Sequence, residues 1–181
     1  MTIQKRTTKE ILEQNRARSI PPLLQRTSIW LHDIRSLYNV GSAFRSADAF
    51  GIDKIHLSGY TPHPPRPEIS KTALGAEEYV TWTAHEQSVQ AIKECKQKGE
   101  YVVAIEQTWQ SHPLDRFMPP QNNNVCLIFG SEVTGLDEEL LQLSDECIEI
   151  PQFGQKHSLN VSVSIGVVLY HVYLKSLSQS G

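Results

Sequence analysis

The sequence predicts an α/β fold: a mostly parallel sheet with helices on both faces. Segments typical of strands alternate with segments typical of helices along the chain, which is the order found in parallel α/β proteins. The central strands, Tyr101–Ile105 and Val125–Phe129, are apolar at nearly every position, as in strands covered on both faces. With 181 residues, the chain is long enough for one core without disulfides.

Local signals predict each element in turn. Thr7 or Thr8 can cap a first helix, which ends before Pro21-Pro22, and Gly51 is a natural C-cap for a helix over 42–50. Proline-rich or polar stretches at 35–41, 61–67 and around Pro119-Pro120 are expected to be loops. The remaining pattern predicts strands at 28–32, 54–57, 101–105, 125–129 and 147–150, and helices at 7–18, 42–50, 88–98, 137–143 and 158–177.

Charge is distributed unevenly. Residues 1–26 carry six basic and two acidic side chains, a net of +4, whereas the other 11 basic and 18 acidic side chains give −7. We therefore expect a basic N-terminal arm over 1–26 and one domain over 27–181. The arm is either a solvated terminus or a segment that contacts phosphates.

The cysteines give no sign of a metal site. Cys95, Cys126 and Cys147 are far apart, without a CxxC pair or a Cys/His cluster, so neither bound metal nor a disulfide framework is expected. Their odd number suits a reducing compartment. The N-terminus lacks the apolar stretch of a secretory signal. A cytoplasmic protein is expected, or one in an organelle reached by a signal that is not recognisable.

The last predicted helix is apolar on all sides. From Ser158 to Leu174 it has no formal charge if His171 is neutral. A membrane span is not expected, because the stretch is short and polar residues interrupt it at Ser158, Asn160, Ser162 and Ser164. Such a helix has to be buried all round, either by other helices or by a second subunit. We favour the interface of a homodimer.

Familiar catalytic motifs are missing. The sequence contains no GxGxxG, HExxH or GxSxG. Gly130 and Gly135 are spaced as in a phosphate-binding P-loop, but Leu136-Asp137 follows instead of Lys-Ser/Thr. These absences argue against the usual dinucleotide, nucleoside triphosphate and zinc-protease sites.

Three segments combine polar side chains with strand ends or helix starts. In the first, over 37–45, Asn39 is expected to cap a helix and Arg45 to lie about one turn further on. In the second, over 128–136, Glu132 lies between two glycines after a buried strand. In the third, over 150–160, Ser158 is expected as an N-cap, with Asn160 in the first turn. Since ligands bind beyond the carboxyl ends of parallel strands, the segments suggest one common site. An ion pair for Arg45 and simple capping by Ser158 and Asn160 are the structural alternatives.

Together these segments resemble the SpoU family of RNA ribose 2′-O-methyltransferases, within the SPOUT superfamily. The resemblance runs from about Trp30 to Tyr173. Its motifs are N-x-G-x-x-x-R with A-F-G over 39–51, F-G-S-E with G-L over 129–136, and I-P with S-L-N-V-S-V over 150–163. One departure is Ser164, where the family commonly has alanine.

The resemblance implies a C-terminal trefoil knot, S-adenosylmethionine as cofactor and a homodimer. Cofactor contacts are implied in the loops 105–107, 130–135 and 150–159, at Ile105, Glu106, Gln107, Gly130, Gly135, Ile150, Ser158 and Leu159. The implied catalytic residues are Arg45, Asn39, Glu132, Ser158 and Asn160. Because arginine stays protonated at neutral pH, we favour Arg45 as stabiliser of the developing alkoxide and ligand of the adjacent phosphate, with base catalysis as the alternative. Glu132 is expected to orient Arg45 or Asn39.

The substrate implied first is tRNA. The segment 71–77 (KTALGAE) resembles members that methylate tRNA, including the enzymes that act on the D-loop guanosine. Candidate phosphate contacts are Lys5, Arg6, Arg16, Arg18 and Arg66. The alternatives are a ribosomal RNA methyltransferase, a non-catalytic RNA-binding member, and an enzyme that methylates a base or a small molecule.

Overall fold

A seven-stranded parallel sheet forms the centre of the protein, in a computed structural model that describes residues 3–178. Along the sheet the strand order is β3-β2-β1-β6-β4-β7-β5. All neighbouring strands within the described residues pair in parallel. The strands are β1 (Thr27–His32), β2 (Lys54–Ser58), β3 (Thr81–His85), β4 (Tyr101–Ile105), β5 (His112–Pro113), β6 (Val125–Phe129) and β7 (Glu146–Glu149).

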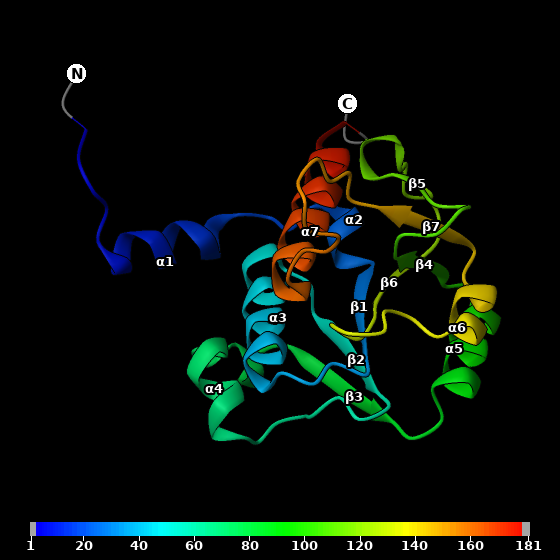
Figure 1. The fold of residues 1–181 in the computed structure, drawn as a ribbon. Helices are drawn as coiled ribbons and strands as arrows, with labels where there is room; N and C mark the ends of the chain where they lie inside the picture. The colour runs from blue at the N-terminus through cyan, green and yellow to red at the C-terminus, as the bar shows by residue number, and fades with distance from the viewer. Residues whose placement is uncertain (1–2, 179–181) are drawn as a thin grey trace.

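Helices cover both faces of this sheet, as predicted (Figure 1). One face carries α2 (Pro22–Gln25), α3 (Leu37–Phe50), α4 (Pro67–Ala73) and α7 (Val161–Ser178), and the other carries α5 (Ser88–Gln97) and α6 (Glu138–Leu143). Short 3₁₀ turns, η1 (Ala76–Glu78) and η2 (Leu114–Arg116), complete the fold. Alternate residues of β1 supply the two cores: Ile29 and Leu31 pack under α3 and α7, and Trp30 packs under α5 and α6.

The N-terminal arm contains α1 (Thr8–Ala17). Thr7 and Glu10 form a capping box in which each side chain accepts from the other residue's backbone N–H. None of the α1 residues is buried, and the helix lies apart from the sheet (Figure 1). The helix is therefore held by local capping and not by packing.

The predicted loop over 35–41 is wrong, because α3 begins at Leu37. Ser36, not Asn39, is the N-cap: its side chain accepts from the Asn39 N–H at 3.3 Å. Gly41 suggested a loop, but it lies inside α3, at a point where α4 packs too closely to leave room for a side chain. A Cβ at this position would come within 2.2 Å of the Ile69 carbonyl oxygen.

The start predicted for the last helix is also wrong. α7 begins at Val161, three residues after Ser158. Asn160 takes the capping role, since its side-chain oxygen accepts from the Ser162 N–H at 2.9 Å. The sequence analysis also missed α2, α4, β3 and β5, which are short or carry mostly exposed residues. Strand and helix boundaries elsewhere agree within two residues.

α7 is buried on one side only within a single chain. Ile165, Val168, Leu169 and Val172 lie in the core, whereas the side chains opposite them are open to solvent. That second side carries Val163, Val167, Tyr170, Leu174 and Leu177, each between 39% and 53% exposed. By length and composition α7 also meets the criterion for a membrane span, as core helices of other proteins do. Its buried side identifies it here as part of the core.

Candidate active site

The main pocket lies at the carboxyl ends of β4, β6 and β7, which are neighbours in the sheet. Its volume is about 370 Å³, within the range of small-molecule sites. We call it the strand-end pocket. The predicted cofactor residues all line it, namely Ile105, Glu106, Gln107, Gly130, Gly135, Ile150, Ser158 and Leu159, together with Glu132 and His157 among others.

The loop after β6 is a tight ring between two glycines. Ser131 and Gly135 exchange two backbone hydrogen bonds, of 3.1 and 3.0 Å. A Cβ on Gly130 would come within 2.4 Å of the backbone of Gly135. Gly135 has φ +70°, and a Cβ there would lie 2.2 Å from the carboxylate of Glu106. Both positions therefore require glycine for the loop to keep this shape.

Side chains from the loop after β4 join the segments around the pocket. The Glu106 carboxylate accepts from the backbone N–H of Leu136 at 3.0 Å and from that of Gln107 at 2.8 Å. The Gln107 amide donates to the carbonyl of His157 at 2.7 Å. The three loops that form the pocket are thus fixed relative to one another within one chain.

The three polar segments singled out in the sequence meet through hydrogen bonds at Asn39. Its amide nitrogen donates to Glu132 at 2.8 Å, and its amide oxygen accepts from Asn160 at 3.2 Å. Glu132 also accepts from the backbone N–H groups of Arg35, at 3.0 Å, and Ser36, at 3.3 Å. Glu132 therefore holds the first turn of α3, where the helix dipole favours a negative charge.

The charge of Glu132 is stabilised by these contacts. Partial burial raises the pKa of the Glu132 carboxyl, but hydrogen bonds from the Arg35 backbone, the Asn39 side chain and other backbone groups lower it further than burial raises it. The net result is a pKa below the ordinary value of 4.5, so the group is ionised at neutral pH.

Arg45, which the resemblance placed in the same site, does not line the strand-end pocket. It lines a separate hollow of about 380 Å³, formed by Ser42, Arg45, Ser46, Ala49, Phe50, Lys71 and Thr72. We call this the Arg45 hollow. Arg45 lies six positions after Asn39, which on a helix is about 9 Å along the axis and about 120° around it. The two side chains therefore point in different directions.

The Arg45 hollow contains a residue that the sequence analysis quoted but did not place in the site. Lys71 lies in the segment 71–77, and it brings a second cation beside Arg45. Thr72 fixes this segment to α3 by donating to the Tyr38 carbonyl at 2.9 Å. Within the described residues, neither Arg45 nor Lys71 has a hydrogen-bond or ion-pair partner in the protein.

The candidate phosphate contacts are spread over the surface. Lys5, Arg6, Arg16 and Arg18 are exposed on the arm, and Arg66 is exposed at the start of α4. Arg26, the last basic residue of the arm, differs from them, because its guanidinium donates to the carbonyls of Pro120 and Asn123. Arg26 thus ties the arm to the domain.

Comparison with known proteins assigns the chain to a family. The family described as SpoU rRNA Methylase matches residues 26–170. A tRNA (guanosine(18)-2'-O)-methyltransferase from Borreliella burgdorferi is 27% identical over 172 residues, which are 93% of this chain and 77% of the relative.

Two solved structures have the same fold. An AdoMet-bound rRNA methyltransferase from Sinorhizobium meliloti has a TM-score of 0.76 at 27% identity, over 82% of this chain and 56% of that one. The chain therefore spans little more than half of that enzyme. A structure concerned with 2-OH methylation of C/U34 on tRNA has a TM-score of 0.73 at 26% identity, over 84% of this chain and 97% of that one. The chain belongs to the SpoU rRNA methylase family.

Proposed function

We propose that this protein transfers the methyl group of S-adenosylmethionine to a ribose 2′-hydroxyl in RNA, with tRNA as the substrate. The observation that carries the proposal is the hydrogen-bonded set Glu132–Asn39–Asn160, which joins all three family motifs next to a pocket of suitable size. The membership of the SpoU family and the names of the relatives support the same reaction.

The strand-end pocket fits the cofactor. Its walls combine apolar side chains, such as Ile105, Phe129 and Ile150, with polar groups from Gln107 and Ser158. That mixture suits a ligand with an aromatic base and polar ends. Gly130 and Gly135 let the backbone of the ring and the Glu106 carboxylate approach each other more closely than a Cβ would allow, which shapes this wall of the pocket. When bound, S-adenosylmethionine supplies a methyl group already activated on a sulfonium centre.

In this proposal some residues hold the site in shape, and Arg45 acts on the substrate. Ser158 and Asn160 hold the segment that closes the pocket, and Glu132 orients Asn39 and the first turn of α3. Arg45 stabilises the negative charge that develops on the 2′-oxygen and binds the adjacent phosphate. A cation beside the reacting oxygen lowers the cost of proton loss without itself accepting the proton.

The relatives suggest two positions in tRNA. One relative is named for guanosine 18, in agreement with the D-loop guanosine expected from the sequence. The structure concerned with C/U34 is matched over 97% of its length. We take guanosine 18 as the first target and nucleotide 34 as the second. A tRNA substrate also agrees with the cytoplasmic location expected from the sequence.

A homodimer is part of the proposal, because the exposed side of α7 is apolar. This exposed side of α7 lies next to the Arg45 hollow, since Phe50 of the hollow packs edge-on against Tyr170 of α7, with ring centroids 6.5 Å apart. A second copy on this side would cover the apolar residues and border Arg45. Leu174→Glu is expected to convert dimer to monomer in analytical ultracentrifugation, whereas Leu12→Glu on α1 is not. A wild-type monomer at micromolar concentration would refute the dimer.

Methyl transfer can be tested on defined RNAs. The purified protein is given radiolabelled S-adenosylmethionine with unmodified tRNA, with tRNA altered at guanosine 18 or at nucleotide 34, and with a ribosomal RNA transcript. We expect label in tRNA, as a 2′-O-methylnucleoside after digestion, and loss of label with one altered tRNA. A labelled base, label in ribosomal RNA alone, or cofactor binding without transfer would each refute the proposal and favour one of the alternatives.

A further inference from the structure

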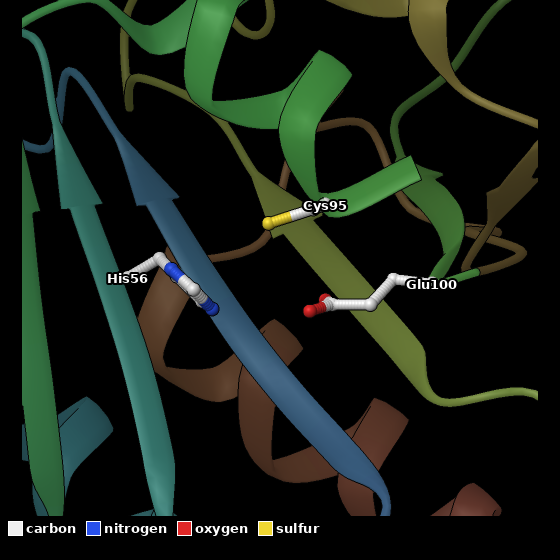
Figure 2. A group of neighbouring side chains, drawn as sticks. All are labelled: His56, Cys95 and Glu100. Carbon is white, nitrogen blue, oxygen red and sulfur yellow. The ribbon is translucent and has the colours of Figure 1, made fainter. Parts of the chain in front are cut away.

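Three potential metal ligands meet on the face of the sheet that α5 and α6 cover. They are His56 of β2, Cys95 in the last turn of α5, and Glu100 in the turn that leads into β4. The His56 ring nitrogen, the Cys95 Sγ and a Glu100 carboxylate oxygen all lie within 4.8 Å of one another. Figure 2 shows the three side chains extending toward one another from these elements. His56 is 2% exposed and Cys95 6%.

The imidazole of His56 is held in place while one of its nitrogens has no partner. Its Nδ1 lies 2.8 Å from Nε2 of His85, and its ring stacks on Trp30 with centroids 4.7 Å apart. Its Nε2 is buried without a hydrogen-bond partner. If the shared proton is on Nδ1, Nε2 has a free lone pair on the side of Cys95 and Glu100. Metal-binding histidines are normally oriented in this way, by a hydrogen bond at the other ring nitrogen.

The donor set defines the kind of ion. Imidazole, thiolate and carboxylate together suit Zn²⁺, which accepts nitrogen, sulfur and oxygen in tetrahedral sites, whereas Mg²⁺ and Ca²⁺ take oxygen donors. One thiolate and one carboxylate balance the two charges of the ion, so the buried site would carry no net charge. Binding requires the Cys95 thiol to release its proton to solvent. Burial and the neighbouring Glu100 raise the pKa of this thiol to about 11, and a bound dication favours the thiolate.

We propose that His56, Cys95 and Glu100 supply three of the four ligands of a tetrahedral binding site for one Zn²⁺ ion, with water as the fourth. The site would tie β2 to the end of α5 and to the start of β4, elements that are far apart in the sequence. Lys54 and Lys98, which lower the pKa of His56 after the larger effect of burial, are the cations that act against a bound metal here.

A second group of potential ligands serves as the control. His32, Asp33 and Asp137 also lie within 4.8 Å of one another, but this group contains no thiol. Both His32 nitrogens already have partners: Ser58 Oγ is 2.8 Å from Nδ1, and Asp137 Oδ2 is 3.1 Å from Nε2. Metal bound at this second group would give no thiolate signal.

Cobalt distinguishes the two groups, because a cobalt–thiolate bond gives a charge-transfer band in the near ultraviolet. The full chain is stripped with a chelator and titrated with Co²⁺ in weak buffer. We expect the band to saturate at about one ion per chain, with release of about one proton and displacement by Zn²⁺. Zn²⁺ should also raise the midpoint of thermal unfolding. A wild-type chain without the band overturns the proposal, whatever the variants do.

Variants assign the ligands. Cys95→Ser should abolish the band, and His56→Gln and Glu100→Gln should each weaken Co²⁺ binding at least tenfold. Cys147→Ser and Asp137→Asn should leave it unchanged. Circular dichroism checks the folding of each variant, and the half-buried Glu100 provides a test if changes at the buried positions unfold the protein. A band that persists in Cys95→Ser, or that is lost in Cys147→Ser, would refute this site.

Discussion

The strand-end pocket and the Arg45 hollow have similar volumes, about 370 and 380 Å³, but they are constructed differently. Side chains and backbone of the same chain hold the pocket, through Glu106, Gln107 and the glycine ring. The hollow has two cationic side chains, Arg45 and Lys71, with no partner within the described residues. The pocket therefore has its shape before any ligand binds, whereas the hollow presents two cations left unpaired by the described residues, as the proposed contacts with the cofactor and with an RNA phosphate would require.

Replacement of Arg45 by alanine should have the largest effect. If Arg45 stabilises the developing alkoxide, methyl transfer should fall by roughly 100- to 1000-fold. Cofactor affinity should stay within a few-fold, because Arg45 does not line the strand-end pocket. Single-turnover kinetics and calorimetry measure the two quantities. Loss of cofactor binding in this variant would show that the strand-end pocket depends on Arg45.

Replacement of Gly135 by alanine should weaken cofactor binding, the quantity that replacement of Arg45 should leave almost unchanged. Its φ of +70° and the contact of 2.2 Å with Glu106 would strain the ring. We expect cofactor affinity to fall about tenfold or more and the free energy of unfolding to fall by about 1–3 kcal/mol. Gly154→Ala is the matched control, since a Cβ there meets nothing within 4 Å. Equal effects of the two changes, in calorimetry and urea unfolding, would contradict this account of the ring.

Glu132→Gln should weaken the hydrogen bonds between the loop after β6 and the start of α3, while the strand-end pocket and α3 themselves stay folded. Because the folded-state pKa of Glu132 is lowered, its carboxylate stabilises the fold above the ordinary pKa of 4.5, and this contribution disappears as the pH falls through the folded-state value. The difference in unfolding free energy between wild type and variant should be below about 1 kcal/mol at pH 7, as the group is largely exposed. Urea unfolding at decreasing pH should show this free-energy difference disappear in acid. A difference that grew in acid would contradict the lowered pKa of Glu132.

The arm should contribute the smallest effect. Lys5→Ala and Arg16→Ala should each weaken tRNA binding a few-fold and lower the salt slope of binding by about one, if each contacts a phosphate. Lys93→Ala, an exposed lysine on α5, is the control. Unchanged salt slopes would assign the arm to the solvated terminus that the charge distribution also allowed.

The signals that predicted the fold correctly are local and strong. β4 and β6 match their apolar runs residue for residue, because fully buried parallel strands need an unbroken apolar stretch. Helix starts were predicted less well, because several polar residues near a helix end can each serve as a cap. The two caps in the structure, Ser36 and Asn160, also make hydrogen bonds to distant parts of the chain, which a local pattern does not show: the Ser36 N–H donates to Glu132, and the Asn160 amide donates to Asn39.

The sequence by itself determined the alternation of strands and helices and the polar loops at the strand ends, which follow from burial and turn chemistry within short windows. The residues expected to contact the cofactor came from the resemblance to the SpoU family. Tertiary structure alone decided that Asn39 contacts Glu132 while Arg45 and Lys71 line one hollow, since helix rotation and the packing of α4 set those positions. It also brought His56 to Cys95 and Glu100, which no spacing rule detects, because parallel pairing places residues distant in the sequence side by side.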